Sequence, residues 1–118
     1  MTQTHKPTFL AIGKFQPGVL ARFEDRLEDR LGVDVIVARS IRALPDDHFD
    51  WGGNGWHPTP LVDAIIVGRG GRPLLDDTKD ALHQLDWMHM GSVPDFFVDF
   101  NDARPVGGMI HDALGILG

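Results

Sequence analysis

Three titratable side chains gather in one glycine-rich stretch of the chain, residues 46–60. They are His48, Asp50 and His57. Imidazole and carboxylate groups exchange protons near neutral pH, so we predict these three residues as the general acid and base of any chemistry. Their spacing matches no zinc-binding pattern, and we predict no metal site. The alternative is a solvated surface loop without a ligand.

The same stretch holds two tryptophans, Trp51 and Trp56. Tryptophan on a loop often anchors a ring or a protein partner, because its large apolar surface carries one polar N–H group. We therefore predict that both side chains bind the ligand. A partner protein is the alternative occupant.

A second candidate site follows an apolar segment, residues 61–67, in which six of the seven residues are apolar. The segment ends in a turn of glycine and arginine: Gly68, Arg69, Gly70, Gly71 and Arg72. Glycine permits a tight turn whose backbone N–H groups face an anion. Arginine binds carboxylate or phosphate oxygens in bidentate fashion. We predict anion binding at this turn; ion pairs from the arginines to Asp76 or Asp77 are the alternative.

The elements that would position these groups alternate along the chain. Apolar and β-branched runs predict strands at 7–15, 33–38, 61–68, 87–90 and 96–100, and apolar periodicity predicts helices at 20–31, 72–85 and 109–114. A short helix is also conceivable at 40–44. The pattern favours an α/β fold: a flavodoxin-like, doubly wound, mainly parallel sheet of four to five strands. A ferredoxin-like α+β sandwich is the alternative.

Two helix boundaries are marked by their residues. The helix at 20–31 carries one apolar stripe and is followed by Gly32, a residue typical of helix ends. Pro73 suits the start of the next helix, and the acidic pair that follows it suits the positive end of the helix dipole.

Composition limits the class of protein. With 118 residues, 42% of them hydrophobic, the chain is expected to form one domain, 1–118. A net charge of −6 argues against a nucleic-acid partner. No apolar run is long enough for a membrane span, and the first residues lack the apolar core of a signal peptide. Together with the absence of cysteine, this predicts a cytoplasmic protein.

The chain resembles the substrate-binding, flavodoxin-like domain of the D-isomer-specific 2-hydroxyacid dehydrogenases. The resemblance runs through segments 6–11, 20–24, 33–35, 62–68, 75–85, 91–93, 98–99 and 107–108. It implies the same fold, with backbone N–H groups of Gly68, Arg69, Gly70 and Gly71 holding a substrate carboxylate. Phe96 and Phe97 stand where the family has a polar pair, and no GxGxxG motif is present. We therefore expect the fold to carry over without hydride transfer, and we predict no cofactor.

These observations predict a stand-alone α/β domain that binds a small carboxylate-bearing molecule or another anion. Whether it also performs acid–base chemistry of the isomerase or lyase type is left open. The alternatives are a non-catalytic protein-interaction domain and a truncated half of a 2-hydroxyacid dehydrogenase. Apolar residues in the last third of the chain further predict a homodimer that uses residues 87–118.

Overall fold

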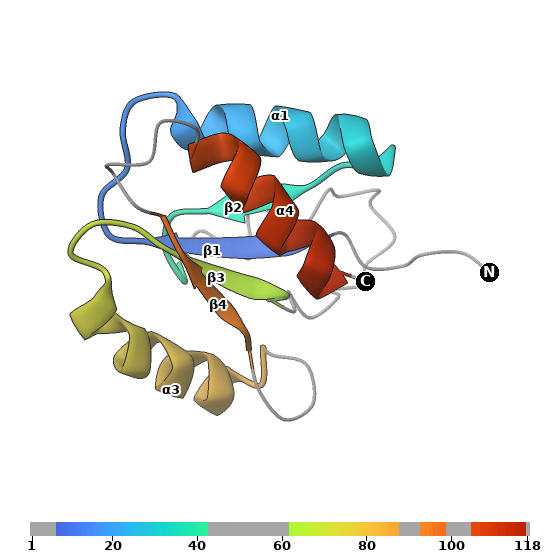
Figure 1. Ribbon diagram of the computed structural model, residues 1–118. Coiled ribbons are helices and arrows are strands. Elements are labelled where there is room, and N and C mark those ends of the chain that lie inside the picture. Colours follow the sequence, from blue (N-terminus) through green and yellow to red (C-terminus); the bar gives the residue numbers. More distant parts are fainter. Residues whose placement is uncertain (1–6, 43–61, 88–92, 99–104, 118) are drawn as a thin grey trace.

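Four short parallel strands form one sheet. The computed structural model describes residues 7–42, 62–87, 93–98 and 105–117. Its strands are β1 (Thr8–Ile12), β2 (Ile36–Ala38), β3 (Ala64–Val67) and β4 (Asp95–Phe97), in the order β2-β1-β3-β4 (Figure 1). Every pairing is parallel. This confirms the predicted parallel sheet and gives β3 an interior position between β1 and β4.

Helices cover both faces of the sheet. Helices α1 (Val19–Leu31) and α4 (Pro105–Leu117) pack together on one face, and α3 (Leu75–Leu85) lies on the other (Figure 1). A short 3₁₀ turn, η1 (Arg72–Leu74), leads from β3 into α3. The arrangement confirms the doubly wound α/β fold.

Strand β3 is buried on both faces, as its apolar sequence predicts. Side chains alternate across a strand, so Ala64 and Ile66 join the core under α1 and α4, while Ile65 and Val67 join the core under α3. All four are at most 1% exposed. Burial on both faces is the usual situation of an interior parallel strand.

Helix α1 follows its predicted apolar stripe. Phe23 and Leu27 are fully buried, and Gly32 ends the helix in the left-handed conformation at φ 72°. The N–H of Gly32 donates to the carbonyl of Glu28 at 2.8 Å, which closes the last turn. Phe23 packs edge-on against Phe9 of β1, with ring centroids 5.3 Å apart.

Helix α3 buries less than its sequence predicts. Its sequence predicts a buried side made of Leu74, Leu75, Thr78, Ala81, Leu82 and Leu85. Of these six residues only Leu82 is buried, and Leu74 and Leu85 are 51% and 44% exposed. Leu74 belongs to the 3₁₀ turn, whose tighter winding breaks the phase of the stripe. Leu85 is the last residue of the helix.

Two further boundaries differ from the prediction. Trp87 itself belongs to the end of α3: its N–H donates to the carbonyl of Leu82, after Asp86 has turned into the left-handed region at φ 59°. The carbonyl of Trp87 accepts the N–H of Val62 at 2.9 Å. Residues 88–90 lie outside the described part of the chain. The last helix spans 105–117 rather than 109–114, because packing on α1 outweighs the cost of its internal glycines, about 1 kcal/mol each.

Among the residues that the structure describes, no helix combines the length and the apolar character needed to cross a bilayer.

Candidate functional site

The strand order defines one edge of the sheet at which a ligand is expected. From β1 the chain moves outward to β2, whereas from β3 it moves outward to β4 on the other side. In open α/β sheets, ligands bind where the connections diverge in this way, beyond the carboxyl ends of the strands. The two loops at this point begin at Gly13 and at Gly68, and the second is the predicted glycine and arginine turn.

The two loops are joined by their backbones. Lys14 and Arg69 form an isolated antiparallel bridge. The N–H of Lys14 donates to the carbonyl of Arg69 at 2.8 Å, and the N–H of Arg69 donates to the carbonyl of Lys14 at 3.0 Å. The N–H of Gly68 donates to the carbonyl of Ile12 at 2.8 Å. The ends of β1 and β3 are therefore held together by hydrogen bonds.

Three glycines permit this close approach. A Cβ atom on Gly68 would lie 2.4 Å from the carbonyl oxygen of Lys14, and one on Gly71 would lie 2.8 Å from that of Ile12. Gly13 has φ 92°, and its Cβ would lie 2.9 Å from backbone atoms of the facing loop. Real Cβ atoms are essentially never this close to backbone, so only glycine fits at these positions.

The backbone contacts correct one part of the sequence analysis. The turn was expected to offer its N–H groups to an anion, but those of Gly68, Arg69 and Gly71 already donate to carbonyl groups, the last to Gly68 at 3.0 Å. Glycine in this turn serves loop-to-loop packing. Gly70 differs: it is exposed, has φ 78°, and its N–H has no acceptor among the described residues.

The side chains at the same edge of the sheet form a feature of a different kind. Directly opposite residues of an antiparallel bridge project their side chains to the same side, with Cα atoms about 5.5 Å apart in a hydrogen-bonded pair. Lys14 and Arg69 are such a pair, and both are exposed. The two cationic side chains therefore project to the same side of the bridge. Their like charges repel each other, and an anion between them would relieve this repulsion.

A third cation lies against the first loop. The guanidinium of Arg39, which follows β2, donates from Nη2 to the carbonyl of Gly13 at 3.1 Å. It also lies over the ring of Phe15, 5.1 Å from the centroid. These contacts fix Arg39 beside the bridge. Neither Lys14 nor Arg39 is among the predicted site residues, although for Lys14 a Gly–Lys pair follows β1 much as a Gly–Arg pair follows β3.

Arg72 lies further along the edge, toward β4. Its guanidinium stacks on the ring of Phe97, 4.1 Å from the centroid. Among the described residues, neither Arg69 nor Arg72 forms an ion pair with the exposed Asp76 or Asp77. We call Lys14, Arg39, Arg69 and Arg72 the basic edge.

The other predicted site residues lie outside the part of the chain that the structure describes. These are His48, Asp50, Trp51, Trp56 and His57. Their assignment as acid, base and aromatic anchors stays a prediction.

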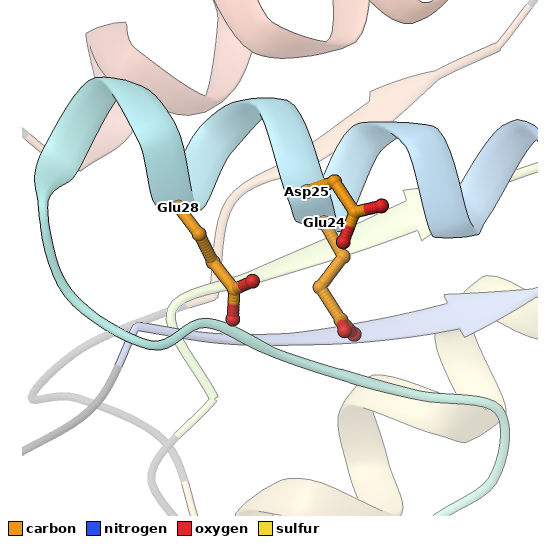
Figure 2. Close-up of side chains that lie close together, drawn as sticks. All are labelled: Glu24, Asp25 and Glu28. Carbon is orange, nitrogen blue, oxygen red and sulfur yellow. The ribbon is translucent and has the colours of Figure 1, made fainter.

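An acidic trio on α1 is the one group of possible metal ligands in the described ranges. Glu24, Asp25 and Glu28 each place a carboxylate oxygen within 4.8 Å of the others (Figure 2). Glu28 has a structural role, because its Oε2 accepts the N–H of Val35 at 2.9 Å and so ties the end of α1 to the start of β2. Exposed acidic groups of this kind are common without a metal ion.

Comparisons with protein families, with curated proteins and with solved structures found no match. The resemblance to the 2-hydroxyacid dehydrogenase domain therefore stays a prediction drawn from the residues quoted above.

Proposed function

We propose that this protein binds small anions, carboxylate-bearing molecules among them, at the basic edge of its parallel sheet. The observation that carries the proposal is the exposed pair of Lys14 and Arg69, which the backbone bridge holds on the same side of the two joined loops. An anion between the two side chains would relieve their repulsion and accept charge-assisted hydrogen bonds from both.

Three neighbouring groups add to this binding. Arg39 is already fixed by Gly13 and Phe15, so its positive charge is present at the edge without a further loss of side-chain freedom. The exposed N–H of Gly70 supplies a backbone donor close to Arg69. Arg72, stacked on Phe97, extends the positive region toward β4.

Two sequence predictions are part of this proposal. Residues His48, Asp50 and His57, with Trp51 and Trp56, would close over the bound anion and supply acid–base chemistry if the protein is an enzyme. The protein would act in the cytoplasm, as its composition suggests. A role as a non-catalytic interaction domain is the alternative.

Calorimetric titration with oxalate, malonate and inorganic phosphate tests the proposal. Wild-type protein should bind at least one of them at low ionic strength. Arg69→Gln and Lys14→Gln should each weaken that binding by about tenfold to a hundredfold, because one charge-assisted hydrogen bond contributes roughly 1.5–3 kcal/mol. Arg26→Gln removes another exposed cation, from α1, and should leave the dissociation constant within about twofold.

Equal affinity in wild type and in the Lys14→Gln/Arg69→Gln double variant would contradict the proposal. So would the absence of binding by all three anions to a protein whose fold is intact.

A further inference from the structure

The two outer strands of the sheet differ in the acceptors that lie beside their free backbone N–H groups. Strand β2 forms one edge and β4 the other. An unpaired edge strand exposes a row of N–H and C=O groups that can pair with another chain. Directly before β2, the carboxylate of Glu28 already accepts the N–H of Val35. The described residues place no comparable side-chain acceptor along β4.

The hydrogen-bonding direction of each β4 residue follows from its pairing with β3. The carbonyl of Pro94 accepts from Ile65, and the N–H of Val98 donates to the carbonyl of Val67. In a parallel ladder, alternate residues bond to the same neighbour, so Pro94, Phe96 and Val98 bond toward β3. The N–H and C=O groups of Asp95 and Phe97 therefore point to the outer side.

The side chains of Asp95 and Phe97 lie on the α3 face of the sheet. They have neighbours of different charge. Asp95 accepts a 2.7 Å hydrogen bond from Lys79 of α3 through Oδ1, and its Oδ2 has no partner among the described residues. Phe97 is 43% exposed and carries the guanidinium of Arg72 on its ring. One end of the strand thus presents a carboxylate oxygen and the other a cation.

We propose that β4 pairs with β4 of a second copy of this chain, antiparallel and about a two-fold axis at Phe96. In this register, Asp95 lies directly opposite Phe97 of the other copy. Since both residues direct their backbone groups outward, each opposite pair exchanges two hydrogen bonds, and all outward groups of Asp95 and Phe97 are satisfied. The result is one continuous sheet across the dimer.

Charge complementarity favours a second copy over an arbitrary strand. Side chains of opposite residues in an antiparallel pair lie on the same face, with Cβ atoms about 5 Å apart. Arg72 stacked on Phe97 is therefore brought to the carboxylate of Asp95 in the other copy, and the symmetry repeats the contact. The short strand predicts a weak dimer whose population depends on protein concentration.

Sedimentation velocity over a range of concentrations tests the proposal with a matched pair of variants. Phe97→Pro removes the outward N–H without touching the bonds to β3, because proline is tolerated where the N–H of an edge strand faces outward. Phe97→Leu keeps the N–H. Both variants remove the ring under Arg72, so they differ in the outward N–H alone. Wild type should dimerise, Phe97→Leu should still dimerise, and the dimer dissociation constant of Phe97→Pro should exceed that of Phe97→Leu by about tenfold or more, since two symmetric hydrogen bonds are lost.

Amide hydrogen exchange of wild-type protein gives a second readout that needs no variant. The Asp95 and Phe97 amides should become protected as concentration rises, while the Val98 amide, bonded to Val67, stays equally protected throughout. A protein that is monomeric at every concentration, a Phe97→Pro variant that dimerises like Phe97→Leu, or concentration-independent exchange at Asp95 and Phe97 would each overturn the proposal. None of these outcomes alters the anion titration of Arg69→Gln, so the two proposals fail separately.

Discussion

Lys14 and Arg69 exchange two backbone hydrogen bonds, of 2.8 Å and 3.0 Å, across the carboxyl ends of β1 and β3. This pair explains why the backbone N–H groups of the glycine turn are occupied and why its cationic side chains lie to one side. The hydrogen bonds occupy backbone groups that an anion would otherwise contact. The same bonds direct two cationic side chains to one side, so positively charged side chains, rather than free backbone N–H groups, lie at the ends of β1 and β3.

The turn predicts a contrast between two of its glycines. Gly68→Ala should destabilise the protein by several kcal/mol, because its Cβ would lie 2.4 Å from the carbonyl oxygen of Lys14, and the loops would have to separate. Gly70→Ala should cost only about 1–2 kcal/mol, the price of the left-handed conformation, since nothing lies within 4 Å of its Cβ. Urea denaturation measures both; equal losses would show that the loops are not packed as described.

A side chain at the amino end of β3 gives a second prediction. Asp63 Oδ2 accepts the N–H of Thr8 at 2.7 Å, and Thr8 is fully buried. Asp63→Ala leaves that N–H without its acceptor and should lower the free energy of unfolding by about 1–3 kcal/mol. Asp63→Asn keeps a carbonyl oxygen and should recover most of the loss. An alanine variant as stable as wild type would contradict this role.

The aromatic core under α1 gives a third prediction. Phe23 is fully buried, with Phe9 at 5.3 Å and Phe96 at 6.4 Å between ring centroids. Phe23→Ala should cost about 3–5 kcal/mol, from lost burial and the cavity left behind. Arg26→Ala on the exposed face of the same helix is the control and should change stability little. A comparably small effect at Phe23 would show that α1 does not pack on β1.

Much of the fold was predictable because local patterns and tertiary burial agree. The run before Gly68 is apolar at every position from Ala64 to Val67, and all of them are buried. In α1, Phe23 and Leu27 lie on the predicted stripe and in the core. Each of these segments follows its own periodicity without help from the rest of the chain.

The boundaries that were missed depend on contacts that are distant in sequence or unusual in residue type. Asp86 adopts the left-handed conformation that normally indicates glycine, so Trp87 was assigned to a strand rather than to a helix end. Gly107 and Gly115 argue against a long last helix, yet α4 spans both because it packs on α1.

Two of the four residues of the basic edge could be predicted from the sequence, and the other two depend on contacts between distant segments. Arg69 and Arg72 were found from their glycine-rich context, and the structure places both on the basic edge. Lys14 carries the same local signal, a Gly–Lys pair after a strand, but its place beside the turn after β3 depends on the strand order. Arg39 has no such local signal, and only the order of the strands brings it from the end of β2 to the loop after β1.

Ionic strength gives a fourth prediction, on binding. The side chains of Lys14 and Arg69 are exposed, so their attraction to an anion is screened by salt. The dissociation constant for oxalate, malonate or phosphate should therefore rise steadily as sodium chloride is increased, as calorimetry would measure. In the Lys14→Gln/Arg69→Gln double variant, any residual binding should depend less on salt. A salt-independent wild-type affinity would indicate binding elsewhere on the chain.

The most direct test of anion binding at the basic edge is a titration of the ¹⁵N-labelled protein with oxalate, malonate and phosphate, followed by ¹H–¹⁵N correlation NMR spectra. We predict that the amide signals of Gly13, Lys14, Arg39, Arg69 and Gly70 shift together with one saturating curve, while those of α1 stay in place. Saturating shifts confined to α1, or no shift at the basic edge with any of the three anions, would contradict the account.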